Sequence, residues 1–475
     1  MTSDLPARLT AAVKAYDVRG VVGVDLTEEI VRALGAAFVD EVGATGGTCV
    51  VGHDMRESSP GFARAFAEGA ARRGANVSVI GLCSTDETYF ASGAWNAPAA
   101  MFTASHNPAE YNGIKFSRAG AQGMSLETGL AAIRDRALAY LSGDIDAVGH
   151  EGEISERDVL HDYAAYLRAL VDLTPIRPLR IVVDAGNGMG GLTVPAVLGT
   201  AAGLAELPIE ILPLYFELDG TFPNHEANPL EPANLIDLQR EVVAQGADVG
   251  LAFDGDADRC FVVDEQGQAV SPSAIAAIVA LREIARVKAL GAAEVVVLHN
   301  LITSNIVAET IVSAGATPIR TRVGHSFIKD EMARTGAVFG GEHSAHYYFR
   351  EFWGADNGML AAMNVLAELG AHPEPMSGLR ERFSPYALSG EINSTVADVS
   401  TALARVRQAF SSRAVEDSLD GLTMIGEVAS DEPFWWFSVR PSNTEPLLRL
   451  NVEAADNDTM SLIRDEVLTL IRKDS

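Results

Sequence analysis

A serine with polar neighbours follows an apolar run early in the chain. Residues 97–102 are small or apolar, and the hexapeptide Thr-Ala-Ser-His-Asn-Pro follows at 103–108. Asn-Pro favours a turn, because proline disfavours helix at the residue before it. The pattern therefore predicts a strand that ends in a loop, where the hydroxyl of Ser105 can face a cleft. We interpret Ser105 as a covalent phosphate carrier, although the hexapeptide taken alone fits a turn without chemistry better.

A cluster of carboxylates is the second group that could do chemistry. Asp254, Asp256 and Asp258 alternate with Gly255 and Ala257, whose small side chains let the backbone curl until the carboxylates converge. Such a cluster repels itself unless a cation neutralises it. Ligands that are all oxygen favour Mg²⁺, Mn²⁺ or Ca²⁺ over zinc. The spacing therefore predicts a Mg²⁺ site that leaves open positions for a phosphate oxygen.

An EF-hand is one alternative for this acidic run, since Glu265 stands twelfth when Asp254 is counted as the first position. The sixth position, however, is Arg259, where an EF-hand needs glycine. The flanking residues 249–253 and 261–263 are typical of strands and not of helices. A solvated acidic turn without a metal stays open as the other alternative.

Two later loops combine groups that suit a sugar phosphate. Residues 341–346 read Gly-Glu-His-Ser-Ala-His, where a carboxylate and a hydroxyl can read sugar hydroxyls, although a polar hairpin turn fits equally well. Residues 440–446 read Arg-Pro-Ser-Asn-Thr-Glu-Pro directly after a predicted strand. An arginine fork, two hydroxyls and turn N–H groups suit a phosphate dianion. The arginines before His325 could also bind an anion, whereas Arg19 is most simply a surface ion-pair former.

The elements that must position these loops form repeated strand–helix–strand patterns. Strands are predicted near 50–52, at 180–184 and at 294–298, and Ser59 is expected to cap the helix after the first of them. The glycine-rich residues 185–191 lack the Walker lysine and the dinucleotide spacing, so a tight strand-to-helix turn is favoured there. We predict three related mixed α/β domains, each with a mostly parallel sheet, and a C-terminal α+β domain. The expected domains are 1–153, 154–268, 269–381 and 382–475.

Composition narrows the function classes. The chain has 475 residues, 48% of them hydrophobic, so several cores can form, and its formal charge of -28 argues against a nucleic-acid or anionic-membrane partner. Three scattered cysteines suggest reduced thiols, with Cys49 and Cys83 in the core. No signal peptide is visible, and the longest apolar stretch, 274–281, is too short to span a membrane. We expect a soluble, cytoplasmic protein that is a monomer or weak dimer.

Together these pieces resemble the α-D-phosphohexomutase family, in order along almost the whole chain. The resemblance implies a four-domain, heart-shaped enzyme with one loop from each domain lining a central cleft. It also implies one Mg²⁺ ion and a hexose 1,6-bisphosphate as activator and intermediate, with sugar phosphates as substrates. The segments that carry it are 16–20 (Tyr-Asp-Val-Arg-Gly), 103–108, 111–115 (Tyr-Asn-Gly-Ile-Lys), 254–259, 324–326 (Gly-His-Ser), 341–346 and 440–444.

The resemblance assigns expected roles residue by residue. Ser105 would carry the phosphoryl group and, with Asp254, Asp256 and Asp258, bind the metal. Arg259 would hold the reacting groups, and Lys115 or His325 is favoured for proton transfer. The remaining expected site residues are His106 near the reaction, Tyr16, Arg19 and His346 near the substrate, Glu342 and Ser344 at sugar hydroxyls 3 and 4, and Arg440, Ser442, Asn443 and Thr444 around the non-reacting phosphate.

The motifs indicate the preferred sugar less directly than the reaction. Glucose and mannose differ at carbon 2, so residues that read hydroxyls 3 and 4 cannot separate them. The loop 341–346 is close to the Gly-Glu-Met-Ser-Gly-His pattern of the phosphomannomutase/phosphoglucomutase subgroup, and His343 and Ala345 depart from it. We predict mannose, with glucose or both sugars as the alternative and phosphoglucosamine as a weaker one. A sugar-phosphate phosphatase and a non-catalytic sugar-phosphate or Ca²⁺-binding protein are the rival classes.

Overall fold

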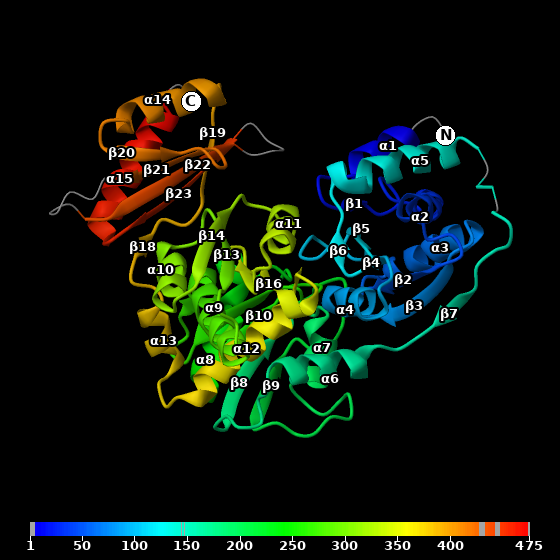
Figure 1. Ribbon diagram of the computed structural model, residues 1–475, viewed down its shortest axis with the longest axis horizontal. Coiled ribbons are helices and arrows are strands. Elements are labelled where there is room, and N and C mark those ends of the chain that lie inside the picture. Colours follow the sequence, from blue (N-terminus) through cyan, green and yellow to red (C-terminus); the bar gives the residue numbers. More distant parts are fainter. Residues whose placement is uncertain (1–4, 144, 147, 427–432, 442–446, 474–475) are drawn as a thin grey trace.

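Four β-sheets, each accompanied by helices, follow one another along the chain (Figure 1). The computed structural model describes residues 5–473 except 144, 147, 427–432 and 442–446, and it leaves out the side chains of His325 and Ser326. The first sheet and its helices form the lobe at the right of Figure 1, and the fourth sheet forms the lobe at the upper left. The second and third sheets lie between and below these lobes.

The first sheet has the strand order β1-β5-β4-β2-β3-β7, with β6 paired to β5. Its strands are β1 (Val18–Val21), β2 (Thr48–His53), β3 (Asn76–Leu82), β4 (Ala99–Phe102), β5 (Tyr111–Arg118), β6 (Gln122–Gly123) and β7 (Ile154–Glu156). The helices of this part are α1 (Leu5–Ala12), α2 (Glu28–Val42), α3 (Ser59–Arg72), α4 (Thr85–Trp95), η1 (Leu126–Leu130) and α5 (Ala131–Leu141).

The second sheet has the order β12-β11-β10-β8-β9 and the third β14-β13-β15-β16-β17. The second comprises β8 (Leu179–Asp184), β9 (Ile209–Leu214), β10 (Val249–Phe253), β11 (Cys260–Asp264) and β12 (Ala269–Val270), with α6 (Leu160–Leu170), α7 (Gly190–Val197), η2 (Pro232–Leu235) and α8 (Ile236–Gln245). The third comprises β13 (Val296–Asn300), β14 (Thr317–Thr321), β15 (Phe339–Gly341), β16 (Tyr347–Phe349) and β17 (Ala355–Asp356), with α9 (Pro272–Ala289), α10 (Asn305–Ser313), α11 (His325–Thr335), η3 (Arg350–Phe352), α12 (Gly358–Ala371) and α13 (Met376–Arg382).

The fourth sheet has the order β18-β23-β22-β21-β20, with β19 paired to β23, and all its described pairs are antiparallel. Its elements are β18 (Ala387–Leu388), β19 (Ile392–Thr395), α14 (Val399–Phe410), β20 (Ala414–Asp417), β21 (Leu422–Gly426), β22 (Trp435–Pro441), β23 (Leu447–Ala454) and α15 (Asn457–Ile471). The α+β character predicted for the C-terminal part is therefore confirmed, as are the three mixed α/β units before it.

The expectation of mostly parallel sheets was wrong. In each of the first three sheets, parallel strands at one side adjoin antiparallel strands at the other. The antiparallel pairs β4–β5, β10–β11 and β15–β16 occupy equivalent places, each beginning with a strand of the parallel part. Strands β4, β10, β11 and β16 are buried throughout and almost wholly apolar, as parallel strands also are, so the pattern alone could not separate the two kinds of pairing.

Local sequence explains how the elements end and begin. In β10 every residue is buried, as expected for a strand covered on both faces. The N-terminus of α4 carries a capping box in which Ser84 and Glu87 satisfy each other's backbone N–H groups. Ser59 does not cap α3 as predicted: it is the first helical residue, and its hydroxyl donates to Asp54 Oδ1 at 2.6 Å.

The hydrophobic cores divide the molecule differently from the sheets. One continuous cluster runs through the second and third sheets and includes residues of the first unit, such as Val50 in β2, Tyr89 in α4 and Met101 in β4. A second cluster lies on the other side of the first sheet, around Phe38, Phe66 and Phe102. The fourth sheet has its own cluster with α14 and α15. Cys49, Cys83 and Cys260 are buried free thiols. Within the described residues, no helix combines the length and apolarity needed to cross a membrane.

Candidate active site

Three hairpin connections bring the predicted chemistry together. We call residues 103–110 between β4 and β5 the serine loop, 254–259 between β10 and β11 the acidic loop, and 342–346 between β15 and β16 the sugar loop. The serine and acidic loops and the end of the sugar loop open on a cavity of about 770 Å³ between the first and third sheets. Of the predicted residues, Tyr16, Arg19, Ser105, His106 and Lys115 line it from the first unit. Asp258, Arg259 and His346 line it from the later units.

Backbone strain marks all three loops. Ser105, Ala257 and Ala345 have φ values of 50°, 61° and 65°, in the left-handed region that favours glycine. Each such residue costs about 1–2 kcal/mol, and strain of this kind persists only where surrounding contacts impose it. At the acidic loop the contact is with the serine loop itself, because a Cβ on Gly255 would lie 2.3 Å from the carbonyl oxygen of Ser105. The two loops therefore meet backbone to backbone.

The Ser105 hydroxyl lies at the centre of this contact. Its Oγ donates to Asp254 Oδ2 at 3.0 Å, lies 3.2 Å from His106 Nδ1, and accepts from Arg259 Nη2 at 3.4 Å. The backbone N–H of Ser105 donates to Thr103 Oγ1 at 2.8 Å. Ser105 is buried with only 4% of its surface exposed, yet it lines the cavity. Its oxygen is thus held between a carboxylate and a guanidinium.

The three aspartates of the acidic loop converge as predicted. One oxygen from each of Asp254, Asp256 and Asp258 lies within 4.8 Å of the others, and all three side chains are buried. Among the described residues, Asp256 Oδ1 and Asp258 Oδ1 have no hydrogen-bond partner. Burial raises the pKa of Asp254 to about 7. Burial would also raise the pKa of Asp256, but Lys115 and the donated hydrogen bonds hold it below its ordinary value.

Lys115 from β5 reaches across to this cluster. Its Nζ lies 2.6 Å from Asp256 Oδ2 and 2.5 Å from Asp258 Oδ2. Burial would lower the pKa of Lys115, but the two carboxylates outweigh it and raise the pKa well above the ordinary value. Lys115 is therefore a charged donor here. The hydroxyl of Thr85, at the N-terminus of α4, donates to the same Asp256 oxygen at 2.5 Å.

His106 and Arg259 form the wall beside Ser105. Arg259 pairs with Asp254 at 2.8 Å and donates to His106 Nδ1 at 2.5 Å. Burial and the charge of Arg259 lower the pKa of His106 to about 2, so the imidazole is neutral and accepts at Nδ1. Arg19 donates to the Asn107 side chain at 2.7 Å, which ties it to the serine loop rather than to a surface ion pair alone.

The sugar loop is built around a buried carboxylate. Glu342 accepts from Tyr348 Oη at 2.9 Å, from Asn300 Nδ2 at 3.2 Å and from the backbone N–H of Gly324 at 3.3 Å. Ser344 is half-buried. His343, which departs from the family pattern, meets Ser273 Oγ at 2.8 Å, and burial lowers its pKa to about 4. His343 therefore anchors the loop to α9 as a neutral side chain.

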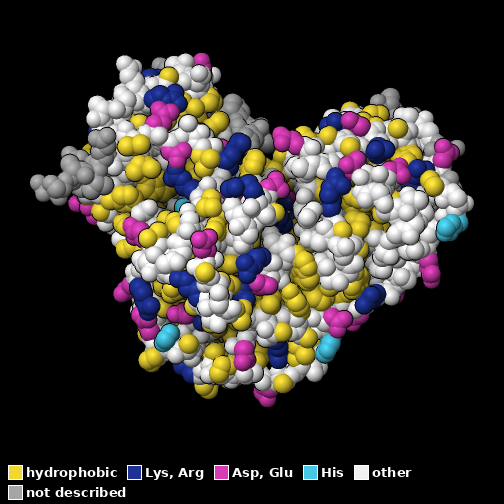
Figure 2. Space-filling model, in the orientation of Figure 1, with side chains coloured by type: hydrophobic (Ala, Val, Ile, Leu, Met, Phe, Trp, Pro, Cys, Tyr) yellow, Lys and Arg dark blue, Asp and Glu magenta, His cyan; other side chains and the backbone are white. Residues whose placement is uncertain are grey.

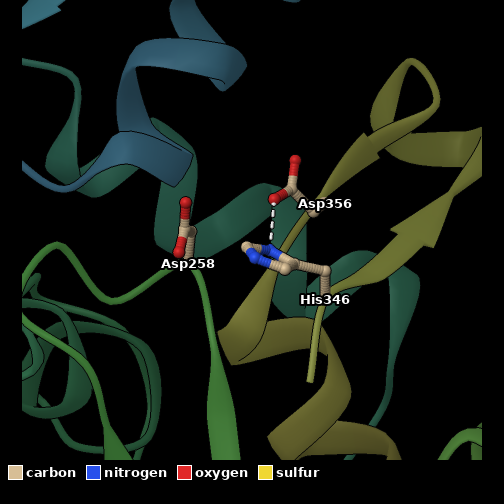
Figure 3. A group of neighbouring side chains, drawn as sticks. All are labelled: Asp258, His346 and Asp356. Atoms are coloured by element: carbon tan, nitrogen blue, oxygen red, sulfur yellow. Dashed lines mark hydrogen bonds and ion pairs between the residues drawn. The ribbon is translucent and has the colours of Figure 1, made fainter. Parts of the chain in front are cut away.

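His346 has a partner that the sequence reasoning missed. Its Nδ1 lies 2.9 Å from Asp356 Oδ2, and the other oxygen of Asp356 lies 2.9 Å from Lys329 Nζ. Figure 3 shows the imidazole between Asp356 and Asp258 of the acidic loop. Asp356 stands in β17, just before α12, and no spacing in the sequence connected it to His346. The Lys329 ammonium also lies 4.4 Å above the Tyr89 ring, so it joins the first and third units.

The C-terminal phosphate loop can be followed only in part. Ser442, Asn443 and Thr444 lie outside the described residues, as does the side chain of His325, which begins α11. Arg440 in β22 is described, and its Nη2 lies 3.5 Å from Glu391 Oε2. Burial and the nearby charge of Arg449 lower the pKa of Arg440, against the charges of Asp420, Glu391 and Glu342. Neither Glu342 nor Arg440 is among the residues that line the cavity.

Comparison with known proteins decides the family. The chain matches four domain families: phosphoglucomutase/phosphomannomutase alpha/beta/alpha domain I at residues 10–140, domain II at 161–267, domain III at 271–386, and the C-terminal domain at 391–470. The chain belongs to the phosphoglucomutase/phosphomannomutase family. The resemblance inferred from the motifs is thereby confirmed, together with an isomerase of the mutase type.

Individual members of this family are similar over their full length. A protein named phosphohexose mutases from Xanthomonas campestris is 38% identical, with 97% of this chain and 99% of that protein covered. A phosphomannomutase of Escherichia coli is 37% identical, with 97% and 98% covered. The crystal structure of a phosphoglucomutase/phosphomannomutase family protein from Burkholderia thailandensis superimposes with a TM-score of 0.84 at 28% identity, covering 98% of both chains.

Proposed function

We propose that this protein interconverts mannose 6-phosphate and mannose 1-phosphate, with Ser105 as the carrier of the phosphoryl group. The observation that carries the proposal is the position of the Ser105 hydroxyl, 3.0 Å from Asp254 and 3.4 Å from Arg259 at the wall of the cavity. The name phosphomannomutase, borne by relatives 36–38% identical to this chain, supports mannose as the sugar.

The acidic loop fits one Mg²⁺ ion. Three buried carboxylates with oxygens in mutual reach, two of them with an oxygen that accepts no hydrogen bond in the described structure, form a hard-oxygen donor set. Asp254, Asp256 and Asp258 would hold the ion, with an oxygen of the phosphorylated Ser105. When bound, the ion supplies positive charge that offsets the phosphoryl group in transfer.

In this proposal one group of side chains binds the phosphate that reacts, and another group binds the phosphate that does not. A phosphoserine carries about -1.5 to -2 charges at neutral pH, and the second phosphate of the substrate adds a similar charge. Arg259 and Lys115 supply positive charge at the reacting end, and Arg440 with Ser442, Asn443 and Thr444 supplies the clamp for the non-reacting phosphate. Proton transfer to and from the sugar hydroxyl falls to Lys115 or His325.

The reaction has two halves in this proposal. Phosphorylated Ser105 gives its phosphoryl group to the free sugar hydroxyl of a hexose monophosphate, which yields a hexose 1,6-bisphosphate. The bisphosphate turns in the cleft, and its other phosphoryl group returns to Ser105. Tyr16, Arg19 and His346 line the space where this happens, and Glu342 and Ser344 are proposed to read hydroxyls 3 and 4. Since these hydroxyls are common to both sugars, glucose phosphates are the alternative substrates. A cytoplasmic location and a monomer or weak dimer complete the proposal.

The test is a coupled assay with mannose 1-phosphate and glucose 1-phosphate in parallel, with Mg²⁺ and a trace of hexose 1,6-bisphosphate. We expect conversion to the 6-phosphates, dependence on the bisphosphate, and a higher kcat/KM for mannose 1-phosphate. Chelation of Mg²⁺ should abolish turnover. Release of inorganic phosphate without bisphosphate dependence would instead identify a phosphatase, and a higher kcat/KM for glucose 1-phosphate would overturn the choice of sugar.

A further inference from the structure

We propose that Arg56 is a positioning residue for phosphoryl transfer, because it fastens the loop that carries Ser105. Arg56 follows β2 and lies outside every motif that predicted the site. Its side chain is 1% exposed, which makes it one of the largest fully buried side chains of the described structure. The proposal rests on the proposed function of Ser105 and adds to it the residue that sets where the serine stands.

The guanidinium of Arg56 binds four backbone carbonyls, three in the serine loop and one at the first residue of β5. Nη2 donates to the carbonyl oxygens of Ser105 at 2.9 Å and Asn107 at 2.6 Å. Nη1 donates to those of Pro108 at 2.8 Å and Tyr111 at 3.0 Å. These four bonds use the two terminal nitrogens completely. Since a guanidinium is planar and rigid, it fixes the four carbonyls relative to one another as well as to β2.

Arg56 is itself held from three sides. Asp54 Oδ2 lies 3.3 Å from its Nε, and Asp54 Oδ1 accepts from its backbone N–H at 3.0 Å. From the second unit, the Phe222 ring lies 5.1 Å from the guanidinium, and a Cβ on Gly220 would come within 2.7 Å of Arg56 Cα. These contacts hold the Arg56 side chain in one position, and the serine loop that it binds is therefore held in a fixed position relative to β2.

The consequence for Ser105 follows from its strained backbone. Its carbonyl oxygen is confined between Arg56 Nη2 and Gly255 of the acidic loop, and this fixes the peptide that follows the left-handed Ser105. The same clamp therefore sets the distance from Ser105 Oγ to Asp254 and Arg259. Transfer between fixed groups is sensitive to placement, since an error of 1 Å can cost about 10²-fold in rate.

A second arginine of this protein offers a matched control. Arg168 in α6 also donates to backbone carbonyls, those of Val197, Gly199 and Ala205, and so fastens a connection of the second unit. It lies outside the cavity wall. Arg56→Lys and Arg168→Lys remove the same fork and keep the same charge, because a lysine presents its donors from a single point. The two variants differ in the segment that loses its hydrogen bonds, which is the serine loop for Arg56→Lys and residues 197–205 for Arg168→Lys.

The experiment compares these two variants in full-length protein. For Arg56→Lys we expect faster amide hydrogen exchange in residues 103–111, a kcat about 10- to 100-fold lower, and a KM for mannose 1-phosphate within about 3-fold of wild type. Arg168→Lys should show faster exchange around 197–205 and a kcat within about 2-fold of wild type. Arg56→Met, which also removes the charge, should lower kcat at least as far as Arg56→Lys.

Three outcomes would overturn the inference. These are a wild-type kcat in Arg56→Lys, an equal loss of kcat in both lysine variants, and unchanged exchange in residues 103–111. The exchange measurement needs no turnover. If wild-type protein shows no mutase activity, the proposed function fails, and the exchange data alone then decide whether Arg56 fastens the loop.

Discussion

The two ends of the candidate site differ in the contacts that hold their charged side chains. At the reacting end, Ser105, Asp254 and Arg259 are buried and bonded to one another at 2.8–3.4 Å, with Lys115 across the cluster. At the other end, the described structure pairs Arg440 with Glu391 at 3.5 Å, and a third of the Glu391 side chain is exposed. Among the described residues, the ion pair at the second end is thus longer and more exposed than those at the first.

The cores underneath explain the difference. The serine and acidic loops rise from units that share a continuous hydrophobic cluster, and they touch through backbone atoms at Gly255. Arg440 rises from the fourth sheet, which has a cluster of its own. That sheet meets the third unit through polar contacts, including Arg320 with Asp417 and the Asn305 N–H with Glu453. Figure 2 shows a notch between the lobe of the fourth sheet and that of the first.

This contrast matches what the proposed reaction demands. Phosphoryl transfer needs a fixed donor, acceptor and set of charges, and pre-organised charges cost no rearrangement during the reaction. A bisphosphate that must turn in the cleft needs a binding site for its non-reacting phosphate that can release this phosphate and then bind the other one. A domain with its own core and polar contacts to its neighbour can move as a unit, as inter-domain interfaces of this kind allow. Variants at the two ends should therefore fail in different ways.

The largest effect is expected at the fixed end, for Ser105→Ala. Removal of the hydroxyl should lower mutase kcat by at least ~10³-fold, because in the proposed reaction Ser105 carries the phosphoryl group between the two halves. Mass spectrometry of protein treated with hexose 1,6-bisphosphate should show one phosphoryl group on the wild type and none on the variant. Ser125→Ala is the control: it removes the helix cap to the Thr128 N–H, so it should cost about 1 kcal/mol of stability and leave kcat unchanged. Equal turnover by Ser105→Ala and wild type would contradict the role of Ser105.

The sequence predicted that Ser105 and the three aspartates lie in loops, and the structure brings these residues together. Asp254, Asp256 and Asp258 lie within five residues, so their spacing suggested that they converge, whereas the turn at Ser105 became a predicted phosphate carrier only beside the other loops. The family resemblance then joined the separate loops. The order of the four units and their mixed α/β character followed from the repeated patterns.

What the sequence could not give depends on contacts between distant residues. Arg56 lies 49 residues before Ser105, and Asp356 lies 10 residues beyond His346, so no local pattern connected either pair. The sheets were predicted to be mostly parallel, and their antiparallel parts were not recognised, since burial on both faces erases the alternation that would distinguish them. The side chain of Ser59 was assigned to a helix cap, yet it bonds Asp54, which in turn holds Arg56.

An intermediate effect is expected at the movable end, for Arg440→Gln. Loss of the guanidinium removes charge-assisted hydrogen bonds to the non-reacting phosphate, each worth about 1.5–3 kcal/mol. We expect KM for mannose 1-phosphate to rise roughly 10- to 100-fold, with a smaller change in kcat. Steady-state kinetics at saturating bisphosphate measure both. Arg413→Gln, which removes an exposed arginine paired with Glu466 in the same unit, is the control. A fall in kcat with unchanged KM would contradict the assignment, because it would place Arg440 at the reacting phosphate.

The smallest effect is expected for Glu391→Gln, which tests whether the charge of Glu391 competes with the non-reacting phosphate for Arg440. Glu391 lies 3.5 Å from Arg440 and 3.4 Å from Arg449, where its charge competes with a phosphate for both guanidinium groups. Partly exposed pairs of this kind are worth about 0–1 kcal/mol. Removal of the charge should therefore lower KM by about 2- to 5-fold and slow the release of bound sugar phosphate. If the bisphosphate must dissociate from Arg440 before it can turn, kcat should fall by about the same factor as KM. A higher KM would contradict this view and would make Glu391 a support that holds Arg440 in place for the phosphate.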